Sequence, residues 1–306
     1  MDLNKIFDKH LFRASSLGYL LAEGKEKSNL DKWQDSVNSL NKISEELNTM
    51  AKFLKDGITI SKNWEKKKEA YLNAQNLEAE LSKVKDKVTL SDGAKTHLMD
   101  VYIFLTTGRK GDIENRYVKK GCLVEDDSIT LYSRVKKQFF KKNETHLNNL
   151  FIKGTPDIFE GESIHTATRL PDIKSSWSVR TFYQTFKRKI NPIYFWQIIA
   201  YMWLTGARSG SIAYCLVDTP ESLIQAEINK LWYKMGQPNT ESPLFQKAME
   251  EIRSEMTYSD IPIKQRLLEY EVEWKYEYID KIKKYVIAGR EYLKEIHQEL
   301  QSKQAA

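Results

Sequence analysis

The stretch NLFIKGTPDIFEGESIHTATRLPDIKSS, residues 149–176, is where the hydrophobic pattern changes from the period of a helix to that of a strand. Its apolar runs and the Glu-Gly-Glu turn at 160–162 predict two strands joined as a hairpin. The first strand carries Asp157, and the second carries Asp172 with Lys174 two residues further on. Acidic residues are depleted in strands. These carboxylates therefore either lie on solvated strand faces or bind something positive.

Strand geometry predicts how these charged side chains are arranged. Residues i and i+2 of a strand point to the same face, so Asp172 and Lys174 project together while Ile173 points into the core. The hairpin would bring Asp157 across from Asp172, about 4–5 Å away. Two carboxylates at that distance repel each other unless a cation lies between them, and hard oxygen ligands suit Mg²⁺ or Mn²⁺. The alternative is an ordinary exposed Asp–Lys pair.

The composition excludes several classes of protein. The chain has 306 residues, of which 41% are hydrophobic, enough for one large core or two domains. It contains no run of about 18 apolar residues that could span a membrane, and its N-terminus lacks the pattern of a secretory signal. Two cysteines in unlike contexts and five scattered histidines exclude a disulfide scaffold and a thiolate zinc site. We therefore expect a protein of the reducing cytoplasm.

The charge distribution favours a polyanionic partner. The net charge of +6 permits such a partner without requiring one. The basic segments SRVKKQFFKKNE (133–144) and TFKRKINP (185–192) flank the strands that carry the carboxylates. Acidic residues that bind cations, flanked by basic residues that bind phosphates, are typical of a nuclease. The alternative for either basic segment is a solvated helix face.

The chain before the strands is predicted to be helical. A short first helix is predicted to end at Gly24. Two helices within 28–88 are predicted to form a hairpin, and the first of them shows an amphipathic period. Further helices are predicted over 90–108 and over 112–139, the latter interrupted near Gly121. Nothing in the hairpin indicates chemistry, and its charged stripes are predicted to be solvated.

The chain after the strands alternates between helix and strand. A helix is predicted over 191–207, with Pro192 at its start and Gly206 past its end. The nearly continuous apolar run at 211–218 predicts a strand covered on both faces. Strict alternation over 267–276 predicts a half-exposed strand with its glutamates facing solvent, and a final helix follows.

This order of elements predicts a mixed α/β fold, a core sheet flanked by helices with an N-terminal helical hairpin added. The corresponding division of the chain is an N-terminal element at 1–27, the helical hairpin at 28–88 and a core at 89–306.

The charged residues occur in the order of a known set of motifs. Thr155-Pro156-Asp157, a gap and then Asp172-Ile173-Lys174 resembles the PD-(D/E)XK nuclease superfamily, whose core is restriction-endonuclease-like. Two further motifs of that superfamily are matched, one by Glu125 upstream of these strands and one by Gln197 and Tyr201 downstream of them. The resemblance implies a Mg²⁺- or Mn²⁺-dependent deoxyribonuclease, with Asp157, Asp172 and Glu125 binding the metal. The residues that it implies for catalysis are Glu125, Asp157, Asp172, Lys174, Gln197 and Tyr201.

Within this superfamily the chain is most similar to the lambda-exonuclease-type viral recombination nucleases, through FRASSLG at 12–18. That likeness implies that Arg13, Ser15 and Ser16 contact the 5′ phosphate of a DNA end. A helix N-terminus with hydroxyls and an arginine is a physically sensible phosphate site, and the two serines are equally good N-caps. The family further implies 5′ to 3′ degradation of one strand, double-stranded DNA ends as substrate, a single-strand annealing partner, a homo-oligomer and, if viral, the host cytoplasm.

Two features depart from the family pattern, and three functions remain open. Asp172 stands where many members have glutamate, and the helical hairpin at 28–88 is an insertion that bears on whether a ring-shaped trimer can form. The first function is an exonuclease that degrades one strand of duplex DNA from its end. The second is a PD-(D/E)XK endonuclease of restriction or junction-resolving type. The third is a non-enzymatic DNA-binding protein.

Overall fold

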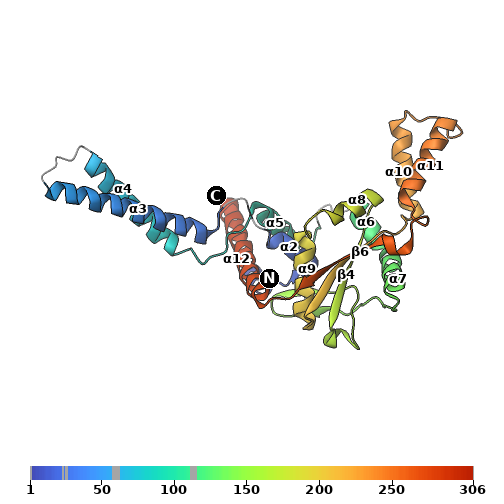
Figure 1. The fold of residues 1–306 in the computed structure, drawn as a ribbon, viewed down its shortest axis with the longest axis horizontal. Coiled ribbons are helices and arrows are strands. Elements are labelled where there is room, and N and C mark those ends of the chain that lie inside the picture. Colours follow the sequence, from blue (N-terminus) through green and yellow to red (C-terminus); the bar gives the residue numbers. More distant parts are fainter. Residues whose placement is uncertain (1, 23, 25–26, 57–62, 111–115, 306) are drawn as a thin grey trace.

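The computed structural model of the chain describes residues 2–22, 24, 27–56, 63–110 and 116–305. These residues form a mixed α/β fold in which helices flank two small sheets, as the sequence predicts (Figure 1). No helix formed by these residues is long and apolar enough to cross a membrane.

The larger sheet has the order β4–β5–β6. β4 (Arg169–Ser175) runs parallel to β5 (Ser209–Cys215), and β5 runs antiparallel to β6 (Leu267–Glu273). The central strand β5 is buried along most of its length, which confirms the apolar strand predicted there. β6 is shorter than predicted because the chain leaves the sheet after Glu273, and helix α12 (Tyr276–Ala305) follows at once.

The predicted hairpin between the two aspartate-bearing strands is wrong. β3 (Ile152–Gly154) ends before Pro156 and belongs to a separate sheet, where it lies between β1 (Phe12–Arg13) and β2 (Leu147–Asn148). Proline has no N–H to donate to a sheet, so the first strand stops there. The backbone ladder between this region and β4 is reduced to an isolated bridge from Glu160 to Arg169 among the described residues, and Asp157 lies in a loop.

Helices cover both faces of the larger sheet. α9 (Pro192–Thr205) packs on one face, its start fixed by Asn191, whose side chain accepts a hydrogen bond from the N–H of Ile193. It ends at Gly206, which has a φ of 86°, so both predicted ends are confirmed. α7 (Glu125–Lys136) packs on the opposite face. Because alternate residues of a strand point to opposite faces, successive residues of each strand face either α9 or α7.

The N-terminal element packs against α9. After α1 (Leu3–Asp8), the turn at Ala14–Ser16 leads into α2 (Leu17–Leu20), which ends before the predicted Gly24. A Cβ atom on Gly18 would lie 2.3 Å from Cα of Ile193, so only glycine permits this close approach to α9. The remaining helices around this core are α5 (Asp92–Thr107), α6 (Arg116–Leu123) and α8 (Val179–Phe186).

Two helical hairpins project from opposite ends of the molecule (Figure 1). The first is α3 (Asn29–Lys55) packed against α4 (Asn63–Ser82), and the second is α10 (Glu221–Lys234) packed against α11 (Pro243–Met256). Between α3 and α4, the predicted break partly lies outside the described residues, as does the start of the helical pattern at 112–139. In that pattern the interruption falls at Val124, between α6 and α7.

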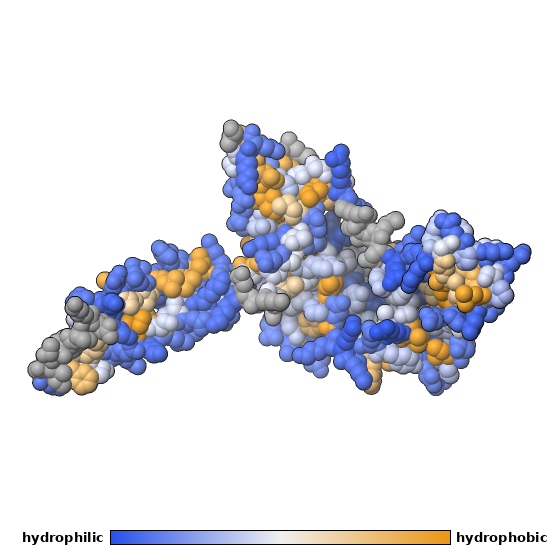
Figure 2. Space-filling view, turned by 90° about the horizontal axis from the view of Figure 1, so that it is seen from above, coloured by the Kyte–Doolittle hydropathy of each residue, from blue (hydrophilic) through white to orange (hydrophobic). Residues whose placement is uncertain are grey.

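The surface of the first hairpin is not uniformly polar. Figure 2 shows apolar side chains along this lobe of the molecule, between hydrophilic stripes. Among its large apolar residues, Leu30, Phe53, Leu72 and Leu77 are about half exposed. A hydrogen bond of 2.7 Å from Trp33 Nε1 to Glu78 Oε1 joins the two helices. Their pairing is therefore specific even though part of their apolar surface faces solvent.

Candidate active site

The strand β4 presents Asp172 and Lys174 on the face covered by α9. Lys174 Nζ lies 2.6 Å from Asp172 Oδ2, and Ile173 between them is buried on the opposite face with α7. The side chain of Asp172 is completely buried and that of Lys174 is 17% exposed. The prediction that these two residues project together is confirmed, but they form a buried pair rather than an ordinary exposed one.

A loop, not a strand, brings Asp157 beside this pair. Oδ2 of Asp157 accepts a hydrogen bond of 2.8 Å from the backbone N–H of Ile173. The loop is held by Asn143, whose backbone N–H donates to the carbonyl of Asp157 at 2.8 Å and whose side chain donates to that of Pro156 at 2.9 Å. Asn143 is thus a positioning residue that the sequence motifs did not indicate. The two aspartates meet although the predicted hairpin does not form.

The two carboxylates are electrostatically costly in this position. Burial, followed by the neighbouring charge of Asp172, raises the pKa of Asp157 to about 7. Burial also raises the pKa of Asp172. Lys174 is ion-paired with Asp172 at 2.6 Å, and no other described residue donates a hydrogen bond of normal geometry to either oxygen of Asp172. Two buried carboxylates beside one ammonium leave negative charge uncompensated, which is destabilising unless a ligand supplies further positive charge.

This donor set fits a hard divalent cation. Asp157 and Asp172 provide adjacent carboxylate oxygens, and those of Asp172 are not used by any hydrogen bond within the described chain. Mg²⁺ typically binds to one or two protein carboxylates and completes its coordination with water and substrate phosphate. Within the described ranges, no group of three or more histidine, cysteine, aspartate or glutamate side chains is close enough to hold a metal by itself. A site here would therefore have positions open to substrate.

Lys174 stays protonated in this environment. Burial by itself would lower the pKa of Lys174, but the charges of Asp172 and Asp157 outweigh it and raise the pKa. Its Nζ atom also lies 5.0 Å from the ring centroid of Tyr194 on α9. The site thus holds a fixed ammonium next to its carboxylates.

The helix α9 supplies Gln197 and Tyr201 to the same region. They lie one turn apart, and Gln197 Nε2 donates a hydrogen bond of 3.0 Å to the hydroxyl of Tyr201. Burial, and then the charges of Asp172 and Asp157, raise the pKa of Tyr201, so its hydroxyl lies near the two carboxylates. Both side chains are buried, with exposed fractions of 7% and 4%. Gln197 therefore fixes the hydroxyl of Tyr201 beside the carboxylates.

Glu125 lies on the other side of the site and is engaged elsewhere. It begins α7, and its Oε2 atom lies 2.7 Å from Nζ of Lys142. It is close enough to Asp157 to contribute a small upward effect on the pKa of that residue. Its carboxylate does not join the aspartates in a three-acid cluster within the described residues.

The N-terminal residues adjoin the site through the backbone of β3. Arg13 is exposed and pairs in register with Lys153, the neighbour of Gly154. A Cβ atom on Gly154 would lie 2.7 Å from a ring carbon of Tyr201 and 2.9 Å from Cβ of Ala14, so these groups are in contact around it. The residue following Arg13 is therefore packed beside the tyrosine that lines the carboxylates.

One of the two serines predicted as N-caps, Ser16, occupies the N-cap position of α2. Its side chain caps no helical N–H, however, and instead donates to the carbonyl of Arg13 at 3.2 Å. Ser15 is exposed within the preceding turn. Because α2 has only four residues, its dipole gives little support for an anion.

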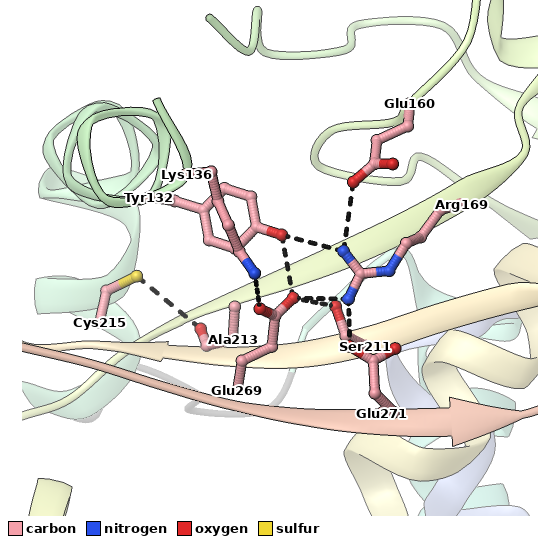
Figure 3. A network of polar contacts seen from close by, with 9 residues as sticks. All are labelled: Tyr132, Lys136, Glu160, Arg169, Ser211, Ala213, Cys215, Glu269 and Glu271. Carbon is pink, nitrogen blue, oxygen red and sulfur yellow. Dashed lines mark hydrogen bonds and ion pairs between the residues drawn. The ribbon is translucent and has the colours of Figure 1, made fainter. Parts of the chain in front are cut away.

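The opposite face of the sheet carries a polar network that the sequence did not indicate (Figure 3). Glu269 Oε1 lies 2.9 Å from Nη2 of Arg169, and it accepts hydrogen bonds of 2.9 Å from Tyr132 and 2.6 Å from Ser211. Its other oxygen lies 2.5 Å from Nζ of Lys136. Burial favours a higher pKa of Glu269, but these donors outweigh it and lower the pKa. Glu269 was predicted to face solvent, and that prediction is wrong.

Comparison with known proteins identifies the fold. No protein-family profile matches the sequence, and no curated protein matches it. The crystal structure of a phage-related exonuclease from Haemophilus somnus 129PT is similar to this chain, with a TM-score of 0.60 and 20% sequence identity. The likeness covers 97% of this chain and 99% of that chain. The chain therefore has the fold of this exonuclease. Because so little of the chain is unmatched, the α3–α4 hairpin must belong largely to the matched part.

Two further structures show a weaker likeness. An alkaline exonuclease from Laribacter hongkongensis has a TM-score of 0.48 and 15% identity, covering 71% of this chain and 88% of that chain. The same enzyme in complex with dAMP has a TM-score of 0.47 and 16% identity, covering 70% and 87%.

Proposed function

We propose that this chain is a metal-dependent exonuclease of the PD-(D/E)XK type, which degrades one strand of duplex DNA from its end. The observation that carries the proposal is the buried pair of carboxylates, Asp157 and Asp172, which repel each other and are only partly compensated by the ammonium of Lys174. The fold shared with a phage-related exonuclease supports it. Neither observation depends on the other.

The residues divide the chemistry among them. Asp157 and Asp172 would hold Mg²⁺ or Mn²⁺, with Glu125 contributing from the far side after release from Lys142. When bound, the ion polarises the scissile phosphate and lowers the pKa of an attacking water. Lys174 donates from its ammonium to that water or to a phosphate oxygen, which places a positive charge where negative charge develops. Tyr201, fixed by Gln197, forms the apolar wall that keeps bulk water from the carboxylates.

The N-terminal element favours an exonuclease over an endonuclease. Arg13 is exposed, and it adjoins the residue that packs beside Tyr201. A terminal phosphate carries more negative charge than an internal diester, so an arginine at this place discriminates ends from interior. We include in the proposal that Arg13, Ser15 and Ser16 bind the 5′ phosphate, which gives 5′ to 3′ polarity. A single-strand annealing protein and further copies of the chain are the proposed partners.

The test compares linear and covalently closed circular duplexes, with Mg²⁺ and with EDTA. Linear duplex with 5′ phosphates should be degraded in Mg²⁺ alone, and about ten- to a hundredfold faster than the same duplex with 5′ hydroxyls. Arg13→Ala should remove most of that difference. Lys174→Ala should slow cleavage strongly in Mg²⁺ while the protein still binds the metal. Cleavage of closed circles at the rate of linear ends would replace the exonuclease by an endonuclease, and DNA binding without any cleavage would leave a binding protein.

A further inference from the structure

A cavity of about 170 Å³ opens next to the candidate active site. Its walls include Tyr194 at the start of α9, Tyr214 on β5 and Tyr270 on β6, while Arg188 and Lys189 from the segment after α8 stand among its lining residues. Neither the superfamily motifs nor the proposed function assigns a role to these five residues. They come from four separate parts of the chain, and only the fold assembles them.

Two of the tyrosines that line the cavity also adjoin Lys174. Tyr194 is the ring that lies 5.0 Å from Nζ of Lys174, and Tyr214 is the register partner of Lys174 on the neighbouring strand. Burial, and then the Tyr194 hydroxyl, raise the pKa of Tyr214 to about 12, with smaller effects from Lys174 and Asp172. Tyr194 and Tyr214 therefore lie between the cavity and the ammonium of Lys174.

The tyrosines form one connected aromatic wall. The ring centroids of Tyr194 and Tyr214 are 6.2 Å apart, and those of Tyr214 and Tyr270 are 6.0 Å apart at an interplanar angle of 79°. The hydroxyl of Tyr270 is buried and has no hydrogen-bond partner within the described chain. A buried donor without an acceptor costs stability, so this hydroxyl lacks a group that a ligand can supply.

The rim of the cavity is basic. Arg188 and Lys189 are exposed, and Nη2 of Arg188 donates to the side chain of Gln184 at 3.2 Å, which holds the guanidinium near α8. Aromatic walls bind the faces and edges of nucleobases, and adjacent cations bind the phosphates between them. A cavity with both, directly beside a phosphate-cleaving site, has the chemistry of a nucleotide subsite.

We propose that this cavity binds one nucleotide of the DNA strand that is being cut, adjacent to the scissile phosphate. The three tyrosines contact its base and sugar, Tyr270 donates a hydrogen bond to it, and Arg188 and Lys189 bind its phosphate. The proposal rests on the proposed function, since it assumes that a DNA strand passes over Asp172 and Lys174. It adds a reason for the strand to remain in register while successive nucleotides are removed.

The test measures binding and cleavage separately. A fluorescent single-stranded oligonucleotide is titrated with the protein in EDTA, where no cleavage occurs, and kcat and KM are measured on duplex in Mg²⁺. Replacing Arg188 and Lys189 together by alanine should weaken oligonucleotide binding by about tenfold or more and raise KM, with a smaller change in kcat. Lys187→Ala is the matched control, because Lys187 is exposed and adjacent in sequence but does not line the cavity.

Tyr270→Phe provides a second, independent variant. It removes a hydroxyl that has no partner in the free protein, so the melting temperature should stay the same or rise while oligonucleotide binding weakens severalfold. A purely structural role of Tyr270 would instead lower stability without changing binding. Unchanged binding in both the double variant and Tyr270→Phe, in a protein that still cleaves DNA, would overturn the subsite and leave the proposed function intact.

Discussion

The two faces of the β4–β5–β6 sheet each bury a carboxylate, and they treat it in opposite ways. On the α7 face, Glu269 is surrounded by donors from Arg169, Tyr132, Ser211 and Lys136. On the α9 face, Asp172 is more deeply buried, with Lys174 as its ion-pair partner and the carboxylate of Asp157 beside it. The pKa of Glu269 is accordingly lowered, while that of Asp172 is raised.

Under the proposed function, this difference separates a structural carboxylate, Glu269, from a metal-binding one, Asp172. A buried charge that is fully hydrogen-bonded contributes to a specific fold, and removing it leaves its partners unsatisfied. A buried carboxylate whose charge is only partly compensated lowers stability in the free protein and is retained where a ligand compensates for it. The number of hydrogen-bond donors around each carboxylate, together with the second carboxylate beside Asp172, distinguishes the two faces.

The largest expected effect concerns Asp172. Asp172→Asn should reduce cleavage in Mg²⁺ by about a thousandfold or more, because one of the two proposed metal-binding carboxylates is lost. In EDTA its melting temperature should fall less than that of Glu269→Ala, since relief of the repulsion with Asp157 offsets the lost ion pair with Lys174. Cleavage assays and thermal unfolding with and without Mg²⁺ check both parts, and the rise in melting temperature on adding Mg²⁺ should disappear. Cleavage at the parental rate would show that Asp172 is not the functional carboxylate.

The next largest effect concerns Glu269 and should have the opposite character. Glu269→Ala should lower the free energy of unfolding by about 3–5 kcal/mol, because Arg169 is left partly buried without its main partner. The remaining folded protein should cleave DNA at close to the parental rate. Glu271→Ala is the control, since Glu271 also pairs with Arg169 but is 63% exposed and should cost at most about 1 kcal/mol. Equal losses in urea unfolding of the two variants would mean that the network is not structural.

The smallest expected effect is a pH dependence that isolates the charge of Glu269. Its pKa in the folded protein lies below the unfolded value, so the stabilisation is complete above the unfolded pKa and is lost as the pH falls through the folded pKa. Glu269→Gln keeps the shape but cannot ionise, and it should be less stable than the parent by about 1–3 kcal/mol near pH 7. Urea unfolding from pH 7 down to about pH 3 should show this difference shrinking on acidification. A difference that is constant with pH would assign the stabilisation to packing alone.

Local patterns in the sequence were sufficient for several parts of this structure. The alternation of a strand placed Asp172 and Lys174 on one face and Ile173 on the other, since that geometry depends only on adjacent residues. Pro192 and Gly206 marked the ends of α9 because each restricts or permits backbone angles by itself. Spacing along that helix also placed Gln197 and Tyr201 within hydrogen-bonding distance.

Pairing between distant segments was beyond those patterns. The predicted hairpin failed because β3 does not pair with the next strand, β4. It pairs instead with β1, which lies near the start of the chain. The glutamates of β6 alternate regularly, yet only the register with β4 and β5 decides that Glu269 meets Arg169 while Glu271 stays largely in solvent. No residue of the strand itself encodes which partner faces it.

The sequence by itself determined which residue types are present at the candidate site and, through strand and helix periods, which of them share a face. Tertiary structure alone decided that Asp172 is fully buried beside a second carboxylate, that Asp157 reaches it from a loop, and that Tyr194, Tyr214 and Tyr270 line one cavity. The physical reason is that periodicity is a property of neighbouring residues along the chain, whereas burial, donor supply and cavities depend on which distant segments pack together.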